Sequence, residues 1–141
     1  MKNYQAGILQ ELSKHARYLS FEVQPDVTDE QVRAALTELK EHVDGESAVI
    51  GLGLSVINTL RNNIEGLHHL PVMTGPGFDI PSTPAALWCW LRGDDRGGLY
   101  HRSRLIEQVL FPAFECSHIL DTFMHKDSRD LSGYEDGTEN P

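Results

Sequence analysis

Residues 16–24 read ARYLSFEVQ, and the order of side chains in this short stretch decides what kind of fold the chain forms. Successive side chains of a strand point to opposite faces of a sheet, so alternation of apolar and polar residues predicts a half-buried strand. The stretch alternates in this way, with Leu19, Phe21 and Val23 on one side and Tyr18, Ser20 and Glu22 on the other. Pro25 closes the strand, because proline cannot donate a hydrogen bond to a ladder.

Two amphipathic helices are predicted, one directly after this strand and one in the C-terminal third. Thr28 is the expected N-cap of the first helix, and Gln31 follows three residues later, as in a capping box. An apolar stripe at helical spacing then runs to Asp44-Gly45, formed by Val32, Ala35, Leu36, Leu39 and Val43. The stripe of the second helix, which Pro112 ends, consists of Leu105, Ile106, Val109 and Leu110.

Three further strands are predicted at residues 47–57, 85–93 and 116–125. Residues 58–84 are expected to form a long loop ordered by Phe78 and Ile80, and residues 94–98 (DDRGG) a turn. The order is therefore strand-helix-strand, loop, strand-helix-strand. This order predicts an α+β fold of the ferredoxin-like βαββαβ kind, in which two helices cover one face of an antiparallel sheet.

Composition limits the kinds of partner. The chain has 141 residues, which suits one domain, and 21 acidic residues against 12 Lys and Arg give a formal net charge of -9. This charge argues against nucleic acid and against an anionic membrane surface as partners. The N-terminus shows no signal sequence and no apolar run is long enough to span a bilayer, so we expect a cytoplasmic protein. Cys89 and Cys116 are far apart and are expected to be reduced.

Several common chemical motifs are missing. The seven histidines show no metal-ligand spacing, so no metal site is predicted on these residues. Gly51 and Gly53 lack the remainder of a nucleotide-binding loop, and close packing is the favoured explanation for them. Trp88 and Trp90 share one strand face. Packing against the helices or a partner subunit explains this pair, and a role as redox relays is the alternative.

The C-terminal segment LSGYEDGTENP, residues 131–141, places glycines on both sides of Asp136. A plain turn is one explanation, because Asp-Gly pairs are common in turns. A phosphatase signature of the haloacid dehalogenase type also ends in Asp-Gly-Thr. That signature needs a nucleophilic aspartate two residues earlier, where this chain has Tyr134. The missing nucleophile argues against the phosphatase.

A third explanation is a family resemblance. Residues 133–137 match the GxxDG motif of dye-decolourising peroxidases, and residues 130–141 (DLSGYEDGTENP) resemble the longer form found in the bacterial cytoplasmic branch. Tyr134 replaces the commoner phenylalanine, which is a conservative change. Residues 5–9 (QAGIL) resemble the Q-x-G-I-L segment that opens the family. The N-terminal half of that family is ferredoxin-like, in agreement with the order of elements predicted above.

The resemblance implies a site on the distal face of haem b. Asp136 would be the acid–base residue, Gly137, Thr138 and Glu139 would contact haem, and Asn140 would brace the loop. A single carboxylate within reach of both peroxide oxygens can take a proton from one and return it to the other. Because the unperturbed pKa of aspartate is about 3.9, against about 6.5 for histidine, we expect activity to be greatest in mild acid. Gly133 and Gly137 would let the backbone approach the porphyrin edge.

The resemblance also implies what this chain does not supply. A full-length member has two ferredoxin-like halves, and its proximal histidine and distal arginine come from the second. We therefore interpret residues 1–126 as the ferredoxin-like N-terminal half and residues 127–141 as the distal haem loop. The whole protein would use hydrogen peroxide to oxidise dyes or phenolic donors, which are bulky aromatic reductants. This chain alone is expected to bind no haem tightly and to be inactive. The alternative is a non-enzymatic ferredoxin-like module that forms homo-oligomers through its sheet.

Overall fold

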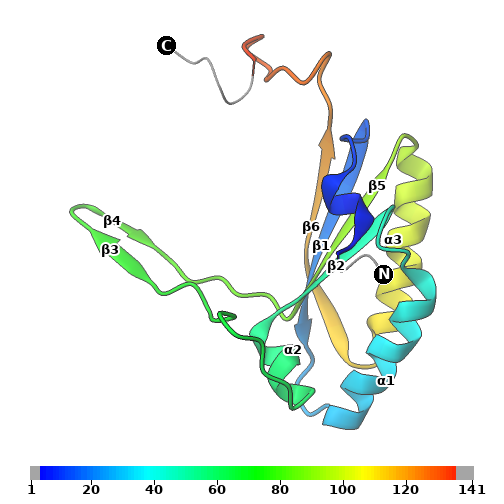
Figure 1. Cartoon of the computed structure of the whole chain (residues 1–141), viewed down its shortest axis with the longest axis vertical. Coiled ribbons are helices and arrows are strands. Elements are labelled where there is room, and N and C mark those ends of the chain that lie inside the picture. The colour runs from blue at the N-terminus through cyan, green and yellow to red at the C-terminus, as the bar shows by residue number, and fades with distance from the viewer. Residues whose placement is uncertain (1–3, 136–141) are drawn as a thin grey trace.

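A computed structural model describes residues 4–135 of the chain and shows a four-stranded antiparallel sheet with helices on one face (Figure 1). The sheet consists of β1 (His15–Val23), β2 (Ala48–Leu52), β5 (Leu87–Gly93) and β6 (Phe114–Phe123), in the order β2-β5-β1-β6. The covering helices are α1 (Asp29–Leu39) and α3 (Arg96–Leu110). This arrangement is the predicted ferredoxin-like fold, which is confirmed.

The smaller elements lie at the margins of the sheet. Two 3-10 turns, η1 and η2, span Ala6–Leu9 and Lys40–His42, and a short helix α2 spans Leu54–Thr59. Strands β3 (Met73–Gly75) and β4 (Phe78–Ile80) form a separate antiparallel hairpin. In Figure 1 this hairpin projects to the left, on the side of the sheet away from α1 and α3. Within residues 4–135, no helix is both long enough and apolar enough to cross a bilayer.

The core lies between the sheet and the two long helices. Leu19 and Phe21 of β1 are 0% and 1% exposed, and they pack with Val32 of α1 and Ile106 of α3. The alternation predicted for residues 16–24 is therefore confirmed, since these side chains point to the helical layer. Each large apolar side chain that is buried in this way stabilises the fold by about 1.5–3 kcal/mol.

The predicted capping box begins α1. The Thr28 hydroxyl accepts a hydrogen bond from the Gln31 backbone at 3.3 Å, and the Gln31 side chain accepts one from the Thr28 backbone at 2.8 Å. The predicted end of this helix is wrong, because α1 stops at Leu39 and a 3-10 turn follows. Val43 is extended, with φ -125° and ψ 135°, although its side chain still packs against the core.

The second predicted strand is too long. Strand β2 ends at Leu52, and Gly53 is the N-cap of helix α2. The Gly53 N–H donates to the Ala86 carbonyl at 2.8 Å, and a Cβ at Gly53 would lie 2.0 Å from the Ala85 carbonyl oxygen. The glycine is needed for this close approach, as the packing explanation predicts. An apolar run alone does not distinguish a strand from a short buried helix.

Residues 94–98 are not simply a turn. Asp95 is the N-cap of α3, and its carboxylate accepts hydrogen bonds from the backbone of Gly97 at 3.2 Å and of Gly98 at 2.8 Å. Helix α3 therefore begins at Arg96, well before its apolar stripe. The carboxylate cap outweighs the low helix propensity of two consecutive glycines by satisfying their free N–H groups.

The long loop predicted at residues 58–84 contains secondary structure. Its first residues belong to α2, and β3 and β4 form the hairpin. Phe78 and Ile80 do lie in an ordered strand, but they are 60% and 42% exposed, so burial in this domain does not order them. The positive φ of Gly77, 82°, allows the tight connection between the two strands.

The two cysteines are free thiols in the structure. Burial raises the pKa of Cys89 to about 12. Burial also raises the pKa of Cys116, and the nearby Glu107 carboxylate adds to this shift. A thiol with a raised pKa carries little thiolate at neutral pH and reacts slowly.

Asp44 organises the connection into β2. Its Oδ1 accepts hydrogen bonds from the backbone N–H groups of Glu46, Ser47 and Ala48, each at 2.9 Å, and its Oδ2 accepts one from the Ser47 hydroxyl at 2.6 Å. Burial by itself would raise the pKa of Asp44. The hydrogen bonds from Ser47 and from the backbone outweigh this effect and lower the pKa to about 2.

We predict that Asp44→Ala destabilises the protein by about 1 kcal/mol at neutral pH, a small value because the carboxylate is exposed and screened by water. The lowered pKa means that this stabilisation is present above the ordinary carboxyl value of 3.8 and is lost as the pH falls towards 2. Urea unfolding of both proteins across this range measures the difference. Asp79→Ala, which removes an exposed carboxylate from β4, is the control. A difference that stays constant down to the lowest pH would contradict the assignment.

Candidate functional site

The predicted site residues lie at the end of the chain, beyond β6. Asp136, Gly137, Thr138, Glu139 and Asn140 fall outside the described residues, so their positions are not described. The structure does describe the segment that leads to them, up to Glu135. The candidate site is therefore built from this segment and from the part of the sheet beside it.

Arg129 braces the last described turn. Its guanidinium donates to the Asp127 carboxylate at 3.2 Å, to the Gly133 carbonyl at 3.1 Å and to the Glu135 carboxylate at 3.1 Å. Arg129 and Glu135 also pair as an isolated antiparallel bridge. Arg129 was missed in the sequence analysis. Asp127 lies two residues before Arg129 and Glu135 six residues after it, and both carry the opposite charge. This charge pattern could have indicated that Arg129 forms local ion pairs.

The Asp130 carboxylate stabilises the same turn through local hydrogen bonds. Its Oδ1 accepts hydrogen bonds from the Ser132 backbone at 2.8 Å, from the Ser132 hydroxyl at 2.5 Å and from the Gly133 backbone at 3.1 Å. The Ser132 hydroxyl and then the backbone N–H groups lower the pKa of Asp130. Gly133 has φ +96°, a conformation that other residues rarely adopt. Residues 129–135 therefore form a turn with its own hydrogen bonds.

A hollow of about 280 Å³ lies beside the start of this segment. Tyr18 and Trp90 form its floor on the open face of the sheet, and His125 and Arg129 contribute from the segment itself. The rest of the lining consists of Leu12, Ser13, Ala16, Thr122, Phe123, Met124 and Ser128. The lining is a mixture of aromatic, aliphatic and polar groups, which is typical of one side of a ligand site.

Three aromatic rings stack on this open face. Tyr18 lies 5.5 Å from Trp88 and 6.0 Å from Trp90 between ring centroids, and the Arg92 guanidinium lies 4.7 Å from the Trp90 ring. Two packing partners were expected for the tryptophans, the helices or a partner subunit. Packing against the helices is wrong, because both tryptophans lie on the open face. Trp90 Nε1 is buried and has no hydrogen-bond partner within residues 4–135.

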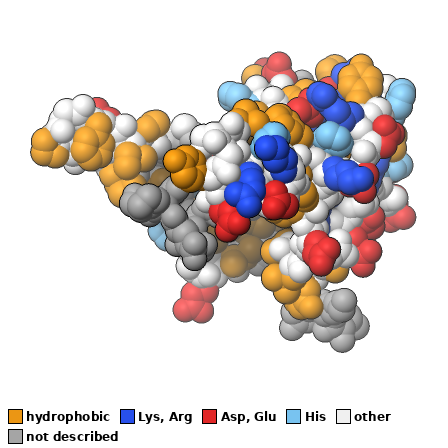
Figure 2. Space-filling model, turned by 90° about the horizontal axis from the view of Figure 1, so that it is seen from above, with side chains coloured by type: hydrophobic (Ala, Val, Ile, Leu, Met, Phe, Trp, Pro, Cys, Tyr) orange, Lys and Arg blue, Asp and Glu red, His pale blue; other side chains and the backbone are white. Residues whose placement is uncertain are grey.

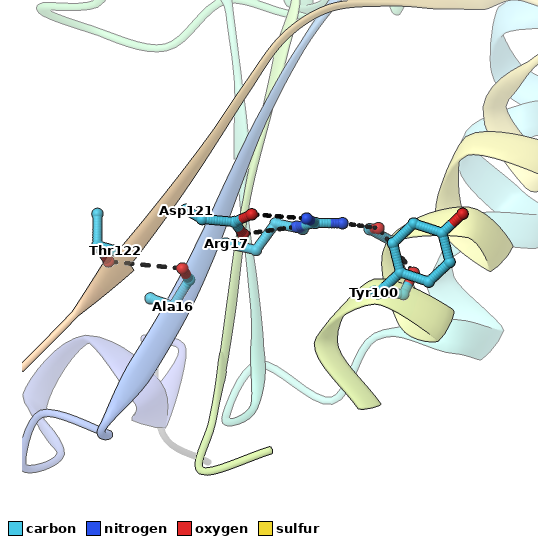
Figure 3. Close-up of polar contacts among 6 residues, drawn as sticks. Ala16, Arg17, Tyr100, Asp121 and Thr122 are labelled. Carbon is cyan, nitrogen blue, oxygen red and sulfur yellow. Dashed lines mark hydrogen bonds and ion pairs between the residues drawn. The ribbon is translucent and has the colours of Figure 1, made fainter. Parts of the chain in front are cut away.

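Arg17 fixes β6, the strand that leads into the candidate site (Figure 3). Its Nε and Nη2 donate to the two oxygens of the Asp121 carboxylate, each at 2.7 Å, and its Nη1 donates to the Ser103 hydroxyl at 3.0 Å. The Ser103 hydroxyl in turn donates to the Tyr100 carbonyl at 2.8 Å. The hydrogen bonds from Arg17 lower the pKa of Asp121. Strands β1 and β6 are in this way tied to helix α3.

The described residues form one wall of a site and do not enclose it. Cofactor sites usually have volumes of about 300–1,000 Å³, and the hollow is smaller than this range. Among residues 4–135, no group of His, Cys, Asp or Glu is arranged to hold a metal ion. The rings of the hollow's floor, Tyr18 and Trp90, are inclined at 24° to each other.

The sequence matches no protein-family model and no curated protein. Solved structures do match. A protein described as a dyp-type peroxidase, from Shewanella oneidensis, is 25% identical, with a TM-score of 0.78 over 96% of this chain and 47% of that one. A variant of DypB from Rhodococcus jostii RHA1 in complex with heme is 25% identical, with a TM-score of 0.76 over 97% of this chain and 48% of that one.

A dye-decolorizing peroxidase from Bacteroides thetaiotaomicron is 17% identical and has a TM-score of 0.73 over 94% of this chain and 47% of that one, which shows the fold alone. The chain thus spans about half the length of the solved structures that it matches. The ferredoxin-like sheet, the two covering helices and these matches show that the chain has the fold of about half of a DyP-type peroxidase, which is consistent with an N-terminal half.

Proposed function

We propose that this chain supplies the distal wall of the haem site in a dye-decolourising peroxidase, a cytoplasmic enzyme that oxidises bulky aromatic donors with hydrogen peroxide. The likeness to solved DyP-type peroxidases over nearly the whole chain carries the proposal. The braced turn at residues 129–135 supports it, because that turn leads directly into Asp136. Haem b would supply the redox chemistry when the whole site is assembled.

Asp136 would move the proton. Peroxide must lose a proton from one oxygen and gain one on the other before the second oxygen can leave as water. A carboxylate within reach of both oxygens can make both transfers, provided that its position is fixed. The Arg129 and Asp130 hydrogen bonds fix the chain just before this residue. Gly137, Thr138 and Glu139 would contact the cofactor, and Asn140 would hold the loop.

The second wall, with its proximal histidine and distal arginine, would come from a second ferredoxin-like half. The matched structures are about twice as long as this chain, which leaves room for such a half. The small volume of the hollow is consistent with a site that two halves complete. On this proposal, the 141-residue chain alone has neither the iron ligand nor the enclosure that tight haem binding needs.

The acid–base assignment is tested in a longer protein that contains this chain and is loaded with haem. Asp136→Asn should lower the rate constant for reaction with peroxide by about 10²–10⁴-fold, because the amide cannot accept the proton. Stopped-flow absorbance measures this rate, and the ultraviolet–visible spectrum checks that the variant holds as much haem. Asp79→Asn, in the distant hairpin, is the control. An unchanged rate in a fully loaded Asp136 variant would remove the assignment.

The pH dependence provides a separate test on the same longer protein. A carboxylate whose pKa is close to the usual value of about 3.9 stays ionised down to mild acid, and it becomes a poorer proton donor as the pH rises. The rate of dye oxidation should therefore be greatest in mild acid and fall towards neutral pH. Steady-state rates in overlapping buffers measure this profile. A bell-shaped profile centred well above neutrality would mean that another group moves the proton.

Haemin titration tests whether this chain is half of a site. We predict that the 141-residue chain produces no sharp Soret band and no peroxidase turnover when haemin is added. The physical reason is that a single wall leaves most of the porphyrin in water. A titration followed by absorbance measures binding, with the longer protein as the positive control. A sharp band with turnover by the 141-residue chain would show that it is a complete enzyme.

A second candidate function is a non-enzymatic module that associates through its sheet. The open face of the sheet supports it, because Trp88 and Leu120 are 36% and 61% exposed there. An apolar face of this kind favours association. A longer protein that fails to bind haem would favour this candidate over the peroxidase. On this candidate, Leu120→Ser should weaken self-association of the chain in sedimentation equilibrium, and an unchanged association would exclude the sheet face as the contact.

A further inference from the structure

The N-terminal segment, residues 5–11, packs against the edge of the sheet at β2. Strand β2 is the outermost strand on its side, so alternate backbone groups point away from β5 and have no neighbouring strand. Unpaired groups of this kind are a template for pairing with another chain. Gln5 satisfies those of Ile50, because its side-chain amide donates to the Ile50 carbonyl at 2.7 Å and accepts from the Ile50 N–H at 2.8 Å. One side chain thus replaces a neighbouring strand at this position.

The other outward-facing groups at the start of β2 are satisfied as well. The Ala48 N–H donates to the Asp44 carboxylate at 2.9 Å, and the Ala48 carbonyl accepts from the Gly45 N–H at 3.0 Å. The Gly45 carbonyl accepts a hydrogen bond from the Gly7 N–H at 2.8 Å. A Cβ at Gly7 would lie 2.2 Å from the Glu46 carbonyl oxygen, so only glycine lets the segment approach this closely. The segment and the turn before β2 therefore close this edge together.

Arg92 of β5 holds the same segment. Its guanidinium donates to the backbone carbonyls of Gly7 and Glu11, and it contacts the carbonyl and the side-chain oxygen of Gln10, each at 3.4 Å. Arg92 is 6% exposed, and no carboxylate among residues 4–135 forms an ion pair with it. A buried charge is costly unless hydrogen bonds replace the water that it loses. The carbonyls of the N-terminal segment provide this replacement, so Arg92 and the segment depend on each other.

Arg92 also contacts the candidate site. Arg92 and Trp90 are two residues apart in β5 and therefore lie on the same face of the sheet, which Figure 2 shows from one end with its mixture of charged and hydrophobic side chains. The guanidinium lies 4.7 Å from the centroid of the Trp90 ring, and the Tyr18 ring lies 6.0 Å from it. A cation over an aromatic ring is attracted to it, most strongly where water is excluded. This contact joins the N-terminal segment to the floor of the hollow.

We propose that residues 5–11 are a clamp, which closes the β2 edge through Gln5 and sets the position of the Trp90 ring through Arg92. Neither Gln5 nor Arg92 lines the hollow, so both are positioning residues that act on it through β2 and the Trp90 ring. A segment distant in sequence thereby determines the shape of the hollow's floor. The inference does not rest on the proposed peroxidase function, because it concerns contacts that the 141-residue chain makes without a cofactor.

The contact with β2 is tested by amide hydrogen exchange, measured residue by residue with NMR on the 141-residue chain. Gln5→Met keeps the length of the side chain but can form neither hydrogen bond to Ile50. The Ile50 amide should then exchange about tenfold faster relative to the amides of β1, because the edge opens without breaking these bonds. Glu11→Ala is the control, because only the backbone carbonyl of Glu11 contacts Arg92. An unchanged Ile50 rate, or an acceleration shared equally by β1, would overturn the closure of the edge by Gln5.

The contact with the hollow is tested by fluorescence. Trp88 and Trp90 are the only tryptophans of the chain, so Trp88→Phe leaves Trp90 as the single probe. In this background Arg92→Met should raise the acrylamide quenching constant of Trp90 by about twofold, because the cation no longer covers the ring. Arg92→Lys should not restore the wild-type value, since one ammonium group cannot reach several carbonyls as the guanidinium does.

Gln5→Met separates the clamp from a contact of Arg92 alone. It leaves Arg92 in place and loosens the segment, so in the Trp88→Phe background it should raise the quenching constant of Trp90 in the same direction. Thermal unfolding checks that each variant is folded at the temperature of measurement, and Gln5→Met remains a test if Arg92→Met does not fold. An unchanged quenching constant in folded Gln5→Met would overturn the proposal, whatever Arg92→Met shows.

Discussion

The position of β1 between β5 and β6 is the constraint on which the rest of the structure depends. Leu19 and Phe21 must point into the helical layer, where they are almost fully buried. The side-chain period of a strand is two residues, so a shift of one residue would place these apolar groups on the open face. Burial of one face therefore sets the register of the sheet and the positions of α1 and α3.

The same constraint creates the open face of the sheet, beside which the candidate site lies. Because the helices cover one side, Tyr18, Trp88 and Trp90 are left on the other, where Tyr18 and Trp90 form the aromatic floor of the hollow. The segment towards Asp136 leaves from the end of β6, and the β3–β4 hairpin projects on this open side (Figure 1). A site completed by a second wall, as proposed for the peroxidase, would use the face that the helices leave open.

Charged side chains fix the connections that hydrophobic burial does not hold. Asp44 satisfies the backbone at the start of β2, Arg17 joins two strands to α3, and Arg129 braces the turn before the GxxDG aspartate. Each acts through several hydrogen bonds to one ionised group, and such bonds are stronger than those between neutral groups. A short segment near the end of a chain can thereby keep a defined conformation without a core of its own.

Local patterns by themselves determined much of this protein. The alternation at residues 16–24 predicted β1, the Thr28–Gln31 pair predicted the start of α1, and the apolar stripe before Pro112 predicted the C-terminal part of α3. The DLSGYEDGTENP segment indicated the family and the candidate Asp136. The predictions of secondary structure succeeded because each depends on neighbours in sequence, whereas the role of Asp136 stays a prediction. Tertiary contacts decided the rest. Gly53 lies against the Ala85 carbonyl, where no Cβ would fit, and is the N-cap of α2 directly after β2. The tryptophans lie on the open face because the helices occupy the other, and residues 73–80 pair as an amphipathic hairpin. A short apolar run is compatible with helix, strand or loop, and only the surface that it packs against selects one.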